Sequence, residues 1–350
     1  MKMQKILSLL LVCTFACFSI LLCGFTFFKK KEVKQEQKLE QTIQNFSDVQ
    51  NDLWCVTFQL VWNEFMEKLT DGKPVQFVGG NPQIADELNK QIYSKEILSE
   101  KSYYISEGKI SKSLKRKIEK NLKKKFDEKS DVLDFINWNA KDSYLFYAML
   151  KKEFSYKNPF DELDSYSFNS STEKVKYFGV NKASSKKIRD NVQVLFYDSV
   201  DEYAVRLLTN EKEDVILFRT DKNDTFQNYY SLINKKSSLS KLTKNDNLKI
   251  PEINVDKMIS YNELTGKKII GTDYLISQAL QTIKFKLDRK GGSLKSEAVI
   301  SIMNTSLMPE EEIVRNFFFD KPFVLFLQEQ GKDKPYFAMK VDSTKYLVKE

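Results

Sequence analysis

TDYLISQALQTIKFKLDRKGGSLKSEAVISIMNTSLMPEEEIVRNFFFDKPFVLFLQEQGKDKPYFAMKVD, residues 272–342, joins two strand patterns through a long intervening segment. Apolar and polar side chains alternate over residues 283–287, which predicts a half-buried strand at 279–287. A nearly continuous apolar run at 323–327 is typical of a strand covered on both faces, and a further strand follows at 336–341. The carboxyl-terminal fifth of the chain is therefore predicted to consist largely of strands.

The segment between these strands does not have the composition of an ordinary loop. It begins with Gly291 and Gly292, where the chain can turn freely, but residues 296–303 read SEAVISIM, which is a strand-like sequence. A loop longer than about 12–15 residues is usually functional or disordered. Because this one could itself pair as a strand, we expect a segment with two states, exposed or inserted into a sheet.

These residues resemble the carboxyl-terminal pattern of the serpin superfamily. The counterparts are a strand and turn at 286–291, a small-residue hinge at 296–298, a strand at 320–327 that begins Asp-Lys-Pro-Phe, and a last strand at 335–341. The resemblance extends over residues 50–350. It implies a serpin-like α+β fold with mixed and antiparallel β-sheets, a helical amino-terminal half and an exposed reactive loop at 296–316.

The amino-terminal part of the body follows the serpin order with one departure. A helix is predicted at 53–65 that stops near 70–72, then a short strand at 75–78 and a second helix at 84–88. Serpins carry a serine-containing motif at the start of their second helix. Residues 79–83, GGNPQ, stand in its place here, and this departure bears on whether the loop inserts.

Residues 111–126 place Leu114, Ile118, Leu122 and Phe126 four positions apart among lysines. This amphipathic pattern is compatible with a helix lying on a sheet and with a basic surface for an anionic membrane or a polyanion. The strand predicted at 143–150 resembles the central strand of serpins. Antiparallel strands are also predicted at 175–180, 192–197, 203–208, 215–218 and 248–255.

In inhibitory serpins a protease cleaves the loop, which then inserts as a new strand and distorts the trapped acyl-enzyme. The resemblance implies two registers here. In the first, the hinge begins at Gly292 and places Lys295 where a lysine fits poorly; in the second, which we prefer, it begins at Ser296. The candidate hinge residues are Gly291, Gly292, Ser296, Glu297 and Ala298, and the candidate inserting residues are Ala298, Ile300 and Ile302.

The scissile bond stays open, because counting in the preferred register leads to Met308-Pro309, which most proteases cannot cleave. Leu307, Met308 and Arg315 are the candidates. The first two imply an elastase- or chymotrypsin-like target and the third a trypsin-like one. The expected function is inhibition of a serine or cysteine protease, and the alternative is a non-inhibitory serpin-fold surface protein with a binding or structural role.

Composition removes the histidine-based kinds of catalytic site and leaves lysine- or carboxylate-based chemistry open. The chain contains no histidine, which removes Ser-His-Asp and Cys-His catalysis as well as HExxH zinc sites. Cys55 is the one cysteine outside the apolar amino terminus and is expected to be buried. The net charge of +8 comes from 56 basic and 48 acidic residues without a nucleic-acid-binding motif. We therefore expect no enzyme activity, cofactor, metal or nucleic-acid partner.

Residues 6–28 carry no charge and reach roughly 34 Å as a helix, enough for a bilayer core of about 30 Å. The lysines at 29–31 compete with Lys2 and Lys5 in setting the orientation. The serpin resemblance favours a monomeric, membrane-anchored body outside the cytoplasm. The predicted division is a signal anchor or transmembrane segment at 1–28, a charged juxtamembrane spacer at 29–48 and a serpin-like domain at 49–350.

Overall fold

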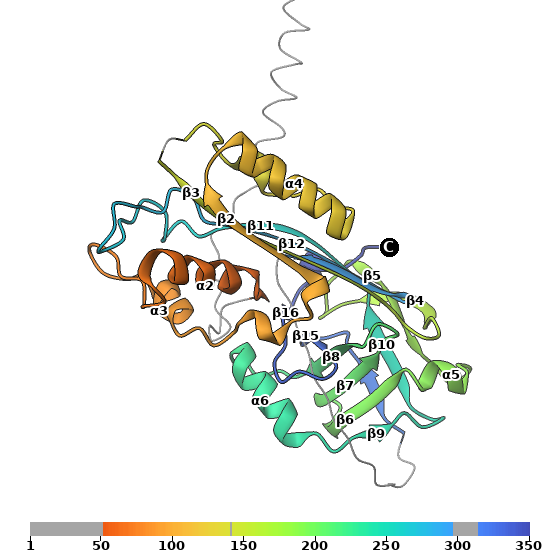
Figure 1. Cartoon of the computed structure of the whole chain (residues 1–350). Coiled ribbons are helices and arrows are strands. Elements are labelled where there is room, and N and C mark those ends of the chain that lie inside the picture. The colour runs from red at the N-terminus through yellow and green to blue at the C-terminus, as the bar shows by residue number, and fades with distance from the viewer. Residues whose placement is uncertain (1–51, 141, 297–313) are drawn as a thin grey trace, which may run out of the picture. The chain divides into compact units, whose positions relative to one another are not determined.

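The computed structural model describes residues 52–140, 142–296 and 314–350 (Figure 1). The predicted anchor and spacer therefore lie outside the described residues. In the described part of the chain, none of the helices has both the length and the apolar character needed to cross a membrane.

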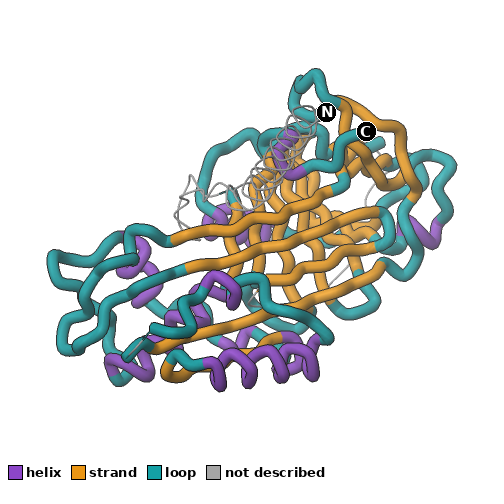
Figure 2. Tube along the Cα trace, turned by 90° about the horizontal axis from the view of Figure 1, so that it is seen from above, coloured by secondary structure: helices purple, strands orange, loops and turns teal. Residues whose placement is uncertain are grey.

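Three β-sheets organise the described residues, and their strands lie side by side in Figure 2. The five-stranded sheet has the order β11 (Ile253–Ser260), β12 (Leu280–Asp288), β13 (Gly291–Ser296), β3 (Tyr144–Ser155) and β2 (Tyr103–Lys109). The seven-stranded sheet has the order β1 (Leu53–Cys55), β16 (Phe337–Val341), β15 (Phe323–Glu329), β8 (Glu213–Arg219), β7 (Glu202–Leu208), β6 (Val192–Ser199) and β9 (Ser240–Lys241). The four-stranded sheet has the order β14 (Asn316–Phe318), β10 (Asn247–Pro251), β5 (Lys174–Val180) and β4 (Asp161–Ser167).

Helices surround these sheets. The α-helices are α2 (Thr57–Thr70), α3 (Gln83–Asn89), α4 (Lys112–Phe126), α5 (Lys186–Arg189) and α6 (Phe226–Lys236). Short 3-10 helices are found at Lys95–Ile97, Glu100–Ser102, Leu133–Phe135 and Thr344–Tyr346. Figure 1 shows α4 on one face of the five-stranded sheet and α2 on the other.

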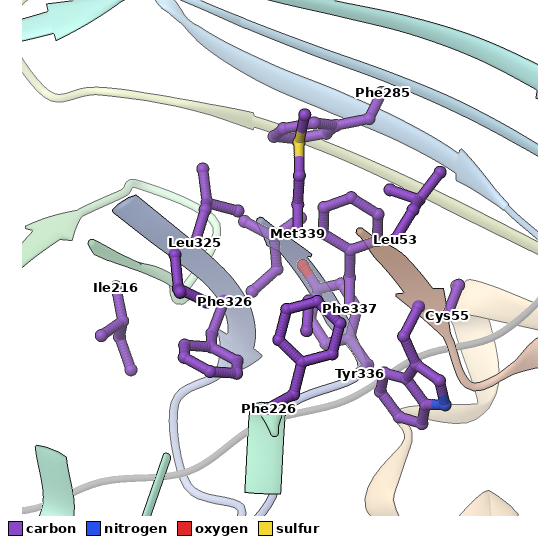
Figure 3. Close-up of a cluster of buried hydrophobic side chains, with 14 of the residues drawn as sticks. Leu53, Cys55, Ile216, Phe226, Phe285, Leu325, Phe326, Tyr336, Phe337 and Met339 are labelled. Atoms are coloured by element: carbon purple, nitrogen blue, oxygen red, sulfur yellow. The ribbon is translucent and has the colours of Figure 1, made fainter. Parts of the chain in front are cut away.

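The main core lies between the five-stranded and seven-stranded sheets (Figure 3). The ring of Phe285 on β12 packs against that of Phe337 on β16 with centroids 4.9 Å apart. On the opposite face of the seven-stranded sheet, Phe226 of α6 meets Phe326 of β15 edge-on, with ring centroids 6.1 Å apart. Burial of such side chains supplies about 1.5–3 kcal/mol each, so the two sheets are held together by their apolar faces.

Helix α4 packs on the outer face of the five-stranded sheet. Ser111 caps it, its Oγ accepting a hydrogen bond from the Leu114 N–H at 3.1 Å. The four apolar residues of its predicted stripe are buried and contact Tyr147 and Met149 of β3. The interpretation of this helix as one lying on a sheet is confirmed, while its lysines face outward.

Several elements differ from the sequence prediction. Residues 75–78, predicted as a short strand, form no strand in the structure, where Phe77 makes an isolated bridge to Ile269. Leu53–Cys55, predicted as the first turn of a helix, is strand β1, because these residues pair with β16 and the helix begins only at Thr57. The single strand predicted at 248–255 is two strands, β10 and β11, which belong to different sheets and are separated by Glu252. Cys55 is buried, as expected.

A candidate strand-insertion site

Strand β13 lies between β12 and β3 and is antiparallel to both. A tight turn joins it to β12, which ends only three residues earlier, at Asp288. Leu294 lies opposite Phe285 of β12 and Lys152 of β3, and its side chain is fully buried in the core. Residues 291–296, for which the sequence predicted a turn and the approach to a hinge, are therefore already a sheet strand.

Glycine is required at the start of β13 because the neighbouring strands approach it closely. A Cβ on Gly291 would come within 2.1 Å of the Phe154 carbonyl oxygen, and the residue has a φ of +153°. A Cβ on Gly292 would lie 2.6 Å from Cζ of Phe154. Such contacts are far shorter than any van der Waals distance, so only glycine lets the hairpin close here.

Beyond Ser296, the strands that the structure describes leave a slot in the sheet. Strand β3 pairs with β13 only from Leu150 to Ser155, and its residues 144–149 pair on their other edge with β2. Strand β12 pairs with β13 only from Ile283 onward, while its residues 280–282 pair with β11. Within the described residues, no strand pairs with the facing edges of these two segments.

A cavity of about 460 Å³ occupies this slot. On one face of the sheet it is lined by Phe58, Trp62 and Phe65 of α2, and on the other by Leu133 and Ile136. Segments 144–148 of β3 and 276–282 around the start of β12 form its two sides. The cavity thus passes through the plane of the sheet at the place where β13 would continue.

The carboxyl-terminal end of the segment predicted as a reactive loop joins the four-stranded sheet. Strand β14 pairs in parallel with β10. Just before it, the Arg315 guanidinium donates to Oδ2 of Asp246 at 2.9 Å and its backbone N–H donates to Oδ1 at 3.0 Å. Asp246 is fully buried. Arg315 is therefore committed to a buried carboxylate, which is unfavourable for the trypsin-like scissile role considered for it.

A second tie at this end comes from Lys249 of β10. Its ammonium lies 4.7 Å from the centre of the Phe318 ring, 4.9 Å from that of Tyr166 and 5.3 Å from that of Tyr177. It also forms an ion pair with Asp320 at 2.6 Å. Cation–π contacts of this kind add to the backbone pairing of β14.

A buried ion cluster lies on the core side of β13. The ammonium of Lys152 contacts Glu213 at the start of β8 and Glu329 at the end of β15, and Tyr336 donates a hydrogen bond to Glu213 at 3.1 Å. Burial raises the pKa of Glu213, and the attraction of Lys152 only partly offsets this. The sequence does not predict this cluster, because these residues lie far apart along the chain and no motif links them.

The structure places part of the predicted site. Gly291, Gly292 and Ser296 are in β13, and Arg315 precedes β14. The remaining hinge, inserting-strand and scissile candidates lie outside the described residues: Glu297, Ala298, Ile300, Ile302, Leu307 and Met308. Lys295, expected to fit poorly in a sheet, is part of β13 and forms ion pairs with Glu128 and Asp131.

No protein-family model matches the chain, and no curated protein matches it. Among solved structures, it is similar to thyroxine-binding globulin in complex with thyroxine, with 12% identity, 84% of this chain and 93% of that chain covered, and a TM-score of 0.48. It is similar to cleaved Serpin 42Da, with 9% identity, 84% and 97% coverage and a TM-score of 0.48. It is also similar to Serpin48 of the insect Tenebrio molitor, with 12% identity, 82% and 96% coverage and a TM-score of 0.40. Two of these three solved structures are named as serpins.

Proposed function

We propose that this chain is a serpin-like inhibitor of a serine or cysteine protease, acting by loop cleavage and strand insertion. The observation that carries the proposal is the position of β13, which already stands between β3 and β12 and ends at an unfilled slot between the same two strands. A protease that cleaves the loop between β13 and β14 would release the new end to extend β13 through the slot. The partner is therefore a protease, and no catalytic group of this chain is needed.

The register of β13 defines where each added residue would lie. Ser296 is opposite Leu150 and Ile283, so Ala298 would come opposite Ala148 and Ile300 opposite Phe146. Side chains alternate along a strand, so the even-numbered residues would share the inner face with Leu294.

On that face the slot is lined by the aromatic rings of α2, which apolar side chains would cover. Ala298, Ile300 and Ile302 are apolar, and burying each isoleucine is worth about 1.5–3 kcal/mol. With Arg315 held by Asp246, we assign the scissile bond to the neighbourhood of Leu307 and Met308 and the target to the elastase- or chymotrypsin-like class.

The test is a denaturing gel of the full-length protein after incubation with elastase-, chymotrypsin-, trypsin- and subtilisin-like proteases. We expect a band at the summed mass with one of the first two, which is absent with a catalytically dead protease. Ile300→Lys, which puts a charge on the inner face, should give plain cleavage without this band. Ser301→Lys on the outer face should retain it. Plain cleavage with every protease, or equal behaviour of the two variants, would count against inhibition.

The alternative is a non-inhibitory serpin-like surface protein, and the cavity is the observation that favours it. A cavity of about 460 Å³ lined by aromatic rings is large enough for a small apolar ligand. If no protease forms a covalent complex, this binding role becomes the better proposal. In either case we propose that residues 6–28 anchor the chain in a membrane with the body outside the cytoplasm.

A further inference from the structure

Three lysines stand in a row on the outer face of the five-stranded sheet. Lys295 of β13 lies directly opposite Lys284 of β12 on one side and Lys151 of β3 on the other. Directly opposite residues in antiparallel strands have Cβ atoms about 4.5–5.5 Å apart, and like charges at such positions are destabilising. By itself, this row of like charges would destabilise the pairing of β13 with its two neighbours.

Two carboxylates from the segment that follows α4 lie over the row. Glu128 contacts Lys151 through Oε1 at 3.2 Å and Lys295 through Oε2 at 3.3 Å. Asp131 contacts Lys295 through Oδ2 at 3.0 Å and Lys284 through Oδ1 at 3.0 Å. Each acid thus bridges the central lysine and one neighbour.

The central lysine depends on these two acids more than its neighbours do. Lys151 also contacts Glu153 at 3.1 Å, and Lys284 has Asp256 at 4.0 Å. In the described part of the chain, the ion-pair partners of Lys295 are Glu128 and Asp131, and its ammonium donates a further hydrogen bond to the Lys129 carbonyl at 2.8 Å. Its side chain is only 18% exposed, so water replaces little of this stabilisation.

The charge of Glu128 is consistent with this arrangement. Burial would raise the pKa of Glu128, but the lysines at 151 and 295 outweigh burial and lower it. The carboxyl is therefore ionised at neutral pH and bridges two cations.

We propose that Glu128 and Asp131 are positioning residues for strand insertion, which hold Lys295 between two like charges and so fix β13 in the sheet. The ion pairs lock the register in which Leu294 fills the core, and this register fixes how residues after Ser296 would enter the slot. The use of this register by a protease inhibitor rests on the proposed function. The occupancy of β13 in the intact chain does not.

The measurement is hydrogen exchange, followed by mass spectrometry, of the intact full-length protein without protease. We expect Glu128→Gln/Asp131→Asn to speed exchange of the β13 amides at least tenfold, with exchange in β7 and β8 unchanged. Asp134→Asn is the matched control, because Asp134 follows in the same segment but pairs with Lys115 of α4 at 2.8 Å. It should leave β13 protected.

Replacing the central lysine separates this role from a purely structural one. Adding Lys295→Met to the double variant removes the row's middle charge, so we expect protection of β13 to return. Unchanged exchange in the double variant would overturn the proposal. So would protection that stays lost in the triple variant, since the acids would then act by shaping their own segment. Absence of a covalent protease complex, with this exchange pattern intact, would count only against the inhibitory function.

Discussion

Lys152 shows how much one side chain can contribute at the residue scale. Its side chain is 7% exposed and its ammonium is the cation between Glu213 and Glu329. In Lys152→Met both carboxylates would remain in the core without it. Removing one partner of a buried ion pair costs about 3–5 kcal/mol, and we expect that loss in the free energy of unfolding by urea at pH 7. Lys157→Met at an exposed position should change it by no more than about 0.5 kcal/mol.

The same cluster sets a pH dependence with a defined sign. The pKa of Glu213 is raised in the folded protein above its ordinary value of 4.5, so the fold binds this proton more tightly than the unfolded chain does. Proton binding by Glu213 contributes its full stabilisation below pH 4.5, and this stabilisation is lost as the pH rises through the folded pKa. The defect of Lys152→Met should therefore shrink when unfolding is measured at about pH 4 to 5. A defect that grows on acidification would contradict this assignment.

At this scale the sequence predicts which strand residues face the core, but it does not predict which charged residues form ion pairs. The pattern around Ile283 correctly indicates which β12 residues face the core. Lys152 and Glu213 are 61 positions apart, and Lys152 and Glu329 are 177 apart, so no local pattern joins them. Lys295 was expected to fit poorly in a sheet, because the two acids that pair with it come from a distant segment and no local pattern joins them to it.

At the scale of elements, β14 and its preceding arginine form the anchor of the loop's far end. Asp246→Asn would remove the charge that holds the Arg315 guanidinium. We expect trypsin to cut after Arg315 at least about tenfold faster in this variant, as measured by mass spectrometry of the fragments. Asp164→Asn, at an exposed position of β4 away from the Arg315–Asp246 pair, is the control. Equally fast cleavage in the unaltered chain would restore Arg315 as a scissile candidate.

Element types were predicted better than element boundaries. The helix at 112–126 and the strand at 280–288 follow from periodicity, and the strand at 323–329 follows from a continuous apolar run. Strand β1 was read as helix, because three residues carry no period of their own and tertiary pairing decides their conformation. Strand β13 was missed because glycines that usually mark a turn here permit close packing against Phe154.

At the scale of the whole molecule, the proposal implies that the intact fold is less stable than the cleaved one. Insertion would fill the slot and pair two open strand edges. Taking a net gain of about 3 kcal/mol, the midpoint of thermal unfolding should rise by about 5 °C or more after cleavage between β13 and β14. Cleaved Ile300→Lys should show no such rise. An unchanged midpoint for the cleaved parent chain would exclude insertion.

The segment between β13 and β14 joins two different sheets, so its length limits how far β13 could extend. Seventeen residues, 297–313, separate the described ends. Each residue added to β13 would lengthen the strand by about 3.3 Å and leave one residue fewer to span the distance to β14. In the uncut chain, each residue added to β13 would therefore stretch the remaining connection further. Cleavage would remove this limit. The number of residues in this connection, whatever their identity, would then determine how many of them can pair with the sheet before the chain is cut.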